Sequence, residues 1–223
     1  MYTLLSGLYK YMFRRDEYCI LILGLDNAGK TTFLEQTKTR FNKNYKGMSF
    51  SKITTTVGLN NLLVGTIDVG KARLMFWDLG GQEELQSLWD KYYAESHGVI
   101  YIIDSTDEER LSESKQAFEK MVTNEILEGV PLLVLANKQD IENCLSIPDI
   151  KTAFSDCINK IGKRDCLTQG CSALTGKGHW VNTFSACQSW ISFRYYSKSP
   201  GEDFRPFSVY NSFLSSVVIH TWH

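Results

Sequence analysis

Short apolar runs separated by polar stretches make up the main pattern of the chain. Continuous apolar runs predict buried β-strands at residues 18–23, 99–103 and 131–136, and weaker runs predict strands at 62–69, 72–77 and 166–172. Stretches with helical spacing lie between them, at residues 30–39, 106–127 and 148–161. Because strands alternate with helices, we expect an α/β fold with an open, mainly parallel six-stranded sheet and helices on both faces.

Local signals refine these elements. Gly70 between two strand runs predicts a hairpin. The acidic stretch 106–109 predicts a helix start, with inward-facing residues at Phe118, Met121 and Val122. Pro148 predicts the first turn of another helix, whose apolar positions are Ile150, Phe154, Cys157 and Ile161.

The two ends of the chain depart from this pattern, so we divide it into four parts. Residues 1–16 predict an amphipathic helix with a positive end, which suits either an anionic membrane surface or packing on its own domain. Residues 17–178 predict the nucleotide-binding domain. Residues 179–193 keep a helical spacing and predict a substitute C-terminal helix. Residues 194–223 predict a disordered tail, in which Ser199-Pro200-Gly201 breaks any helix.

Composition excludes several classes of protein. A net charge of -1 gives no overall attraction to nucleic acid. No apolar run reaches the ~20 residues that a transmembrane helix needs, and the N-terminus lacks the pattern of a secretory signal. Tyr2 excludes N-myristoylation, which requires glycine there. The six cysteines form no C-x-x-C pair, and Cys19 and Cys171 fall in predicted strands, so we expect reduced, apolar cysteines in a cytosolic setting.

The strongest chemical motif follows the first strand. Residues 24–31 fit G-x-x-x-x-G-K-[ST], the P-loop: Gly24, Leu25, Asp26, Asn27, Ala28, Gly29, Lys30 and Thr31, with Thr32 continuing into the helix. Gly24 and Gly29 let the loop curl so that its amides converge on phosphate oxygens. Lys30 supplies a cation for the outer phosphates, and the Thr31 hydroxyl is a hard oxygen ligand for Mg²⁺. We therefore expect a nucleoside triphosphate site.

Two further segments complete the phosphate end. Asp78 ends a predicted strand and can reach the magnesium ion, commonly through water. Gly81 can offer an unhindered amide to the terminal phosphate, and Gln82, the expected catalytic residue, can orient the attacking water. Thr56 is predicted to bind magnesium only while the γ-phosphate is present, with Thr54 and Thr55 as competing choices.

The base end is predicted at Asn137, Lys138 and Asp140, directly after a buried strand. The Asp140 carboxylate can accept hydrogen bonds from N1–H and the 2-amino group of guanine, which adenine does not offer. Asn137 can bind N7 and hold the loop, and the Lys138 stem can cover the base. Backbone amides of Ser172 and Ala173 can donate to guanine O6.

Two other classes of protein remain open at this point. A P-loop kinase or ATPase shares the phosphate motif, and the guanine-type base motif argues against it. A binding module that does not cycle between nucleotide states shares all of the motifs. It would hold nucleotide poorly because its C-terminus is altered. Nucleotide content after purification distinguishes this module from a cycling switch.

At these motifs the chain resembles the small GTP-binding proteins of the Arf family. The shared residues are Gly-Leu-Asp-x-Ala-Gly-Lys-Thr at 24–31, Thr-Val-Gly-Leu-Asn at 56–60, Trp-Asp-Leu-Gly-Gly-Gln at 77–82 and Lys-Gln-Asp at 138–140. The resemblance covers about residues 1–178 and implies the P-loop small GTPase fold, with Mg²⁺ bound beside GTP or GDP. It implies a GTP switch in the cytosol and at Golgi membranes. The carboxylate of Asp26 is expected near the γ-phosphate and disfavours unaided hydrolysis, so we expect slow hydrolysis without a partner. An exchange factor, an activating protein and effectors would be its partners, and the N-terminal helix would contact the membrane.

The chain departs from the family at three places. Asn27 stands where the family usually has alanine. The segment 60–65 is about three residues longer than the family's hairpin entry, so we expect either a shifted register or a bulge there. After Gly178 the charged C-terminal helix of the family is replaced by a sequence rich in serine and aromatic residues.

Overall fold

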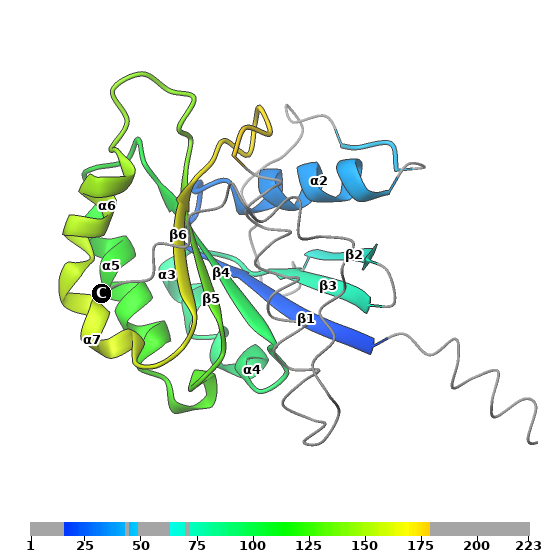
Figure 1. Cartoon of the computed structure of the whole chain (residues 1–223), viewed down its shortest axis with the longest axis horizontal. Helices are drawn as coiled ribbons and strands as arrows, with labels where there is room; N and C mark the ends of the chain where they lie inside the picture. Colours follow the sequence, from blue (N-terminus) through cyan, green and yellow to red (C-terminus); the bar gives the residue numbers. More distant parts are fainter. Residues whose placement is uncertain (1–15, 43–44, 49–62, 70–71, 179–223) are drawn as a thin grey trace, which may run out of the picture.

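The computed structural model describes residues 16–42, 45–48, 63–69 and 72–178. They form a six-stranded sheet, as the sequence predicts, and its strand order is β2-β3-β1-β4-β5-β6 (Figure 1). Its strands are β1 (Asp16–Leu23), β2 (Leu63–Val69), β3 (Ala72–Asp78), β4 (Gly98–Asp104), β5 (Leu132–Asn137) and β6 (Cys166–Gly170). Only the β2–β3 pair is antiparallel among these strands. The carboxyl ends of β1, β3, β4, β5 and β6 therefore meet at one edge of the sheet.

Helices cover both faces of this sheet (Figure 1). Helix α2 (Lys30–Phe41) lies on one face, while α5 (Leu111–Val122), α6 (Ile147–Ala153) and α7 (Ile158–Ile161) lie on the other. The short helices α3 (Glu83–Gln86) and α4 (Asp90–Tyr93) follow β3, and two 3-10 turns, η2 (Glu125–Leu127) and η3 (Ser155–Cys157), complete the described elements. The sequence pattern did not reveal α3 and α4.

The alternation of side chains along β1 divides the core into two layers. Ile20 and Ile22 pack toward α2 in one cluster with Phe33 and Leu34. Leu21 and Leu23 point the other way, into a larger cluster with Tyr101, Phe118 and Met121. Because β1 and β4 are buried on both faces, their sequences are continuous apolar runs, which is why the pattern predicted them well.

The predicted hairpin is confirmed and has a regular register between Leu63 and Val69. Val64 lies opposite Trp77 and Thr66 opposite Met75. Gly65 faces α2, where an added Cβ would come within 2.5 Å of Leu34 Cδ1. The buried Ile67 shares that face. The described part of β2 thus contains no bulge, and the remainder of segment 60–65 lies outside the described residues.

Three details of the helix and strand predictions are wrong. The stretch 106–110 forms turns rather than helix, because Asp104 and Asp107 accept backbone hydrogen bonds there, so α5 begins at Leu111. This helix also ends at Val122 rather than near Leu127, which lies in the separate turn η2. The single helix expected over 148–161 is divided into α6, η3 and α7, although its four apolar positions are all buried. Cys171 lies just beyond the end of β6, yet it is buried in an apolar cluster, as expected, and its thiol also donates to Asn137 Oδ1.

The predictions for the termini fall on residues outside the described ranges. These are the amphipathic helix of 1–16 (apart from Asp16, which starts β1), the substitute helix of 179–193 and the tail of 194–223. The four-part division therefore stays a prediction. Within the described residues, no helix is both long and apolar enough to span a bilayer.

Candidate nucleotide-binding site

The loop between β1 and α2 has the strained geometry that its glycines predict. Gly24 has φ +133, and a Cβ there would lie 2.2 Å from the carbonyl oxygen of Ile102. Gly29 has φ +93, and a Cβ there would lie 2.4 Å from Asn137 Nδ2. Both positions therefore exclude any other residue. Asn27 also has a positive φ of 60, where asparagine is tolerated better than the alanine of the family.

Lys30 is the buried cation of this loop. Its ammonium donates to the carbonyl oxygens of Gly24, at 3.0 Å, and Leu25, at 2.7 Å. Burial lowers the pKa of Lys30 to about 8, and the nearby Asp78 and Asp26 carboxylates only partly oppose this effect. The ammonium is therefore held by weak acceptors at the N-terminus of α2. The ammonium can exchange these carbonyl oxygens for a phosphate oxygen, which is a stronger acceptor.

Thr31 and Asp78 meet at the same place, as predicted from sequence. The Thr31 hydroxyl donates to Asp78 Oδ2 at 2.6 Å. Asp78 is fully buried, and its Oδ1 has no hydrogen-bond partner in the structure. Burial raises the pKa of Asp78, while Lys30 and the Thr31 hydroxyl oppose the rise. A buried carboxylate oxygen without a partner, beside a hydroxyl, fits Mg²⁺, which prefers hard oxygen ligands and keeps several waters.

Gly81 and Gln82 lie directly against the P-loop. A Cβ on Gly81 would come within 2.3 Å of the Asp26 amide nitrogen and of the Gly24 carbonyl oxygen. Only glycine fits this approach, which places its backbone directly beside the P-loop. Gln82 is the N-cap residue of α3 and is half-buried. Thr56, the other predicted metal ligand, lies outside the described residues.

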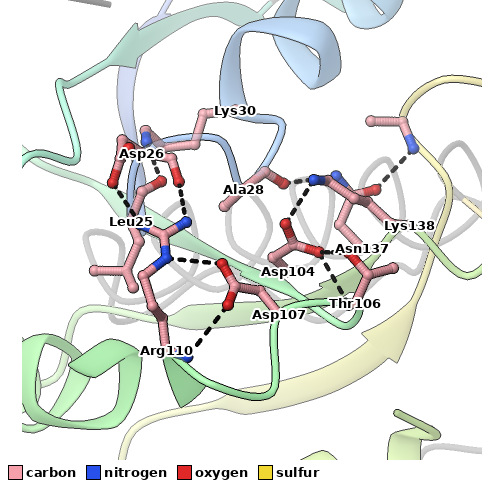
Figure 2. Close-up of polar contacts among 11 residues, drawn as sticks. Leu25, Asp26, Ala28, Lys30, Asp104, Thr106, Asp107, Arg110, Asn137 and Lys138 are labelled. Atoms are coloured by element: carbon pink, nitrogen blue, oxygen red, sulfur yellow. Dashed lines mark hydrogen bonds and ion pairs between the residues drawn. The ribbon is translucent and has the colours of Figure 1, made fainter. Parts of the chain in front are cut away.

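Asn137 joins the phosphate end to the base end (Figure 2). Its Nδ2 donates to the Ala28 carbonyl of the P-loop at 2.8 Å, and its Oδ1 accepts from the Ala173 amide at 2.8 Å. The side chain is buried, so both bonds form away from water. Asn137 therefore fixes the distance between the two ends, which agrees with its predicted holding role; its contact with N7 stays a prediction.

The rest of the base end lies at the rim of the protein. Asp140 is exposed, and Lys138 has a positive φ of 66, with its ammonium 2.5 Å from Asp104 Oδ2. Gln139 holds this loop by donating to Ser105 Oγ and the Leu145 carbonyl. The stem of Lys138 is thus fixed beside an open surface, where a base can lie against it.

The expected donors to guanine O6 are engaged within the protein. The Ser172 amide donates to the Lys177 carbonyl at 2.8 Å, and the Ala173 amide donates to Asn137. In this arrangement neither is available to a base oxygen. Both residues are buried next to Asn137, so their placement at the base end agrees with the sequence, while their role as donors stays a prediction.

Sequence reasoning missed three charged residues beside the P-loop: Asp104, Asp107 and Arg110 (Figure 2). Arg110 donates from Nη1 to Asp26 Oδ1 at 2.8 Å and from Nε to Asp107 Oδ2 at 2.7 Å. Asp104 ends β4 and pairs with Asn137 in the register of the sheet. A signal was available for Asp104, because carboxyl ends of neighbouring parallel strands converge. Arg110 gave no such signal.

Comparison with known proteins agrees with this geometry. Residues 4–188 match the ADP-ribosylation factor family. The chain is 88% identical over 178 residues to ADP-ribosylation factor-related protein 1 of Bos taurus, and 87% identical to that of Homo sapiens. Each alignment covers 80% of this chain and 87% of the relative. ADP-ribosylation factor-like protein 3 of Saccharomyces cerevisiae is 48% identical over 179 residues, which are 80% of this chain and 88% of the relative.

Among solved structures, the Arl6 BBS3 small GTPase from Trypanosoma brucei with the bound nucleotide analogue GppNp is similar in fold. The TM-score is 0.67 at 25% identity, and the match covers 79% of this chain and 98% of that chain. The described strands and helices are thus arranged as in a small GTPase whose structure holds a nucleotide analogue. The chain belongs to the ADP-ribosylation factor family of small GTPases, which bind and hydrolyse GTP.

Proposed function

We propose that this small GTPase controls recruitment to Golgi membranes and the vesicle traffic that depends on it. In the proposed cycle an exchange factor loads GTP, effectors bind the GTP state, and an activating protein ends it. The protein acts peripherally, moving between the cytosol and trans-Golgi membranes, with residues 1–16 in contact with the lipid. Support comes from the family and from close identity to Arf-related proteins.

One observation carries the proposal at the level of the site: Lys30, Thr31 and Asp78 converge beside the P-loop. Lys30 and Asp78 are buried and Thr31 is half-buried; the Lys30 ammonium donates to two backbone carbonyls, and the Thr31 hydroxyl donates to Asp78. Such an arrangement has no evident use in stabilising the fold, because burying charged groups costs free energy. It suits a polyanion with a divalent cation, which supplies the missing partners.

The residues divide the hydrolysis of GTP between them. Water attacks the γ-phosphorus in line, and the bond to the bridging oxygen of GDP breaks. Gln82 orients that water, and the Gly81 amide and Lys30 hold the γ-phosphate oxygens as negative charge moves toward the leaving group. Thr31 and Asp78 hold the Mg²⁺, which neutralises charge on the β- and γ-phosphates when bound. Asp140 selects guanine.

Hydrolysis without a partner is expected to be slow. Arg110 is the arginine that contacts the P-loop in the described structure, and its guanidinium is already bound by Asp26 and Asp107. An activating protein can bring an arginine of its own to the γ-phosphate, as arginine fingers do in other GTPases. We therefore expect the switch to remain loaded until such a partner arrives.

Nucleotide content of the purified full-length chain tests the biochemical part of the proposal. We expect guanine nucleotide near one equivalent, released when EDTA removes Mg²⁺. Labelled GTP should then rebind, and excess ATP should fail to displace it. A protein that holds no nucleotide would support the non-cycling module, and displacement by ATP would support the ATPase class.

Microscopy of fluorescent fusions tests the membrane part. Gln82→Leu should hold the GTP state by slowing hydrolysis, and Thr31→Asn should hold the GDP state by removing a magnesium ligand. We expect the first variant to overlap with a trans-Golgi marker and the second to be diffuse. The same distribution for both variants would contradict nucleotide-controlled recruitment.

A further inference from the structure

Arg110 connects two loops through two carboxylates. Its Nη1 lies 2.8 Å from Asp26 Oδ1, and its Nη2 donates to the Asp26 carbonyl at 3.3 Å. Its Nε lies 2.7 Å from Asp107 Oδ2, and its own amide donates to Asp107 Oδ1 at 3.2 Å. Arg110 and Asp26 are each about one-third exposed. The guanidinium is therefore held in one orientation, with one of its edges against the P-loop (Figure 2).

This pair lies at the end of the loop that faces the outer phosphates. The Asp26 amide is next to Gly81, the residue expected beside the γ-phosphate. Lys30 is close enough to respond to both charges, because Asp26 raises its pKa and Arg110 lowers it. The charges of Asp26 and Arg110 therefore act on the same small region as the charge of the γ-phosphate.

A carboxylate in this region would repel the γ-phosphate if nothing neutralised it. GDP lacks that phosphate, so the repulsion is larger for GTP than for GDP. Arg110 offsets the Asp26 charge directly, because its guanidinium forms a charge-assisted hydrogen bond with the carboxylate. Asp107 holds Arg110 from the opposite side, and the raised pKa of Arg110 agrees with this double pairing.

We propose that Arg110 is a specificity-determining residue, which neutralises Asp26 and so sets the preference of this GTPase for GTP over GDP. Its role is electrostatic and acts through Asp26, so Arg110 is a positioning residue and need not touch the nucleotide. The inference rests on the proposed nucleotide site and adds to it the control of triphosphate against diphosphate.

The test is the ratio of the dissociation constants for GDP and a non-hydrolysable GTP analogue, measured with Mg²⁺ on the full chain by fluorescence. Arg110→Ala should lower the preference for the triphosphate on the order of tenfold, as expected for one unit charge at a partly exposed site. Asp26→Asn, which leaves the cation in place, should raise that preference. The double variant should return close to the wild-type ratio.

Two controls separate this effect from a structural one. Arg110→Lys keeps the charge and should retain most of the preference. Arg73→Ala removes an arginine from an exposed pair with Asp68 on the hairpin, and it should leave the ratio unchanged. Raising the ionic strength should shrink the Arg110→Ala effect, because salt screens partly exposed charges.

The outcomes are distinguishable. Equal weakening of both nucleotides in Arg110→Ala, or a double variant no closer to wild type than Arg110→Ala, would overturn the inference and leave the proposed function intact. A wild-type chain that binds neither nucleotide would overturn both. A change of ratio in opposite directions for Arg110→Ala and Asp26→Asn is the result that supports the role of Arg110.

Discussion

The phosphate end and the base end of the site differ in how deeply their polar side chains are buried. At the phosphate end the polar side chains are buried: Lys30 is 5% exposed and Asp78 is 0% exposed. At the base end Asp140, the carboxylate proposed to select guanine, lies at the surface. The residues expected to bind phosphate therefore lie in the core of the fold, where their buried charges lower the free energy of unfolding. The residue proposed to select the base lies at the rim, where a substitution should change the free energy of unfolding little.

This contrast leads us to expect that a variant at the phosphate end should change both binding and stability, whereas one at the rim should change specificity alone. Asn137 is the link between the two ends, so its loss should affect both. The four predictions below test these expectations in order of decreasing effect.

The largest effect is expected for Lys30→Met. Methionine fills a similar volume without the charge, so the outer phosphates lose their buried cation, and affinity for GTP should fall ~100-fold or more. Affinity for xanthosine triphosphate should fall equally, because the lost contact does not involve the base. Labelled nucleotide titration measures both. A loss confined to one of the two bases would show that the ends are not independent.

Asn137→Ala should be the next largest. The Ala28 carbonyl and the Ala173 amide would lose their buried partner, which is expected to cost about 2–4 kcal/mol of the free energy of unfolding. Urea denaturation of the nucleotide-free protein measures this. Asn159→Ala, at an exposed position of α7, serves as the control with little change. Equal stabilities for the two variants would show that Asn137 does not join the ends.

Asp140→Asn should change specificity at the rim. The amide replaces one acceptor with a donor, so guanine loses about 1–3 kcal/mol, or roughly 10- to 100-fold in affinity, while xanthine gains a donor for its 2-oxo group. Competition between guanosine and xanthosine triphosphates measures this change of base preference. The free energy of unfolding should stay unchanged. A loss of stability comparable with that of Asn137→Ala would place Asp140 within the core, against the present comparison.

The smallest effect concerns pH. Lys30 has a folded-state pKa of about 8 against 10.5 for the ordinary side chain. Between pH 8 and 9 the unfolded chain therefore binds more protons at this position, so Lys30 should contribute a rise in stability of about 1 kcal/mol in the nucleotide-free protein. Burial raises the pKa of Cys19, Cys166 and Cys171 to about 12, so these thiols ionise first in the unfolded chain and oppose that rise as the pH approaches 9. The contribution of Lys30 is therefore measured as a difference from a variant that lacks the lysine.

Lys30→Met should lose this contribution to the pH dependence, and Lys120→Met on the exposed side of α5 should keep it. Urea denaturation at pH 8 and pH 9 gives the two slopes. Identical slopes for the wild type and Lys30→Met would mean that the ammonium is solvated in the folded protein, contrary to its burial.

Local signals explain why much of the fold was predictable. Buried strands such as β1 and β4 are long apolar runs, and the P-loop glycines carry their own backbone requirement. Short helices were harder. Helix α3 has four residues, too few for a periodic pattern, and it begins where the chain leaves Gly81 against the P-loop. The break between α6 and α7 likewise leaves the spacing of buried residues intact, so no local pattern marks it.

The sequence by itself determined the six strands, the longer helices and the phosphate loop, and it supplied the candidate residues for guanine, because each depends on neighbouring positions in the chain. Only the tertiary structure decided that Arg110 neutralises Asp26, 84 residues away, and that Asn137 joins Ala28 to Ala173. These contacts arise because parallel strands bring their carboxyl ends to one edge of the sheet, where residues distant in sequence become neighbours.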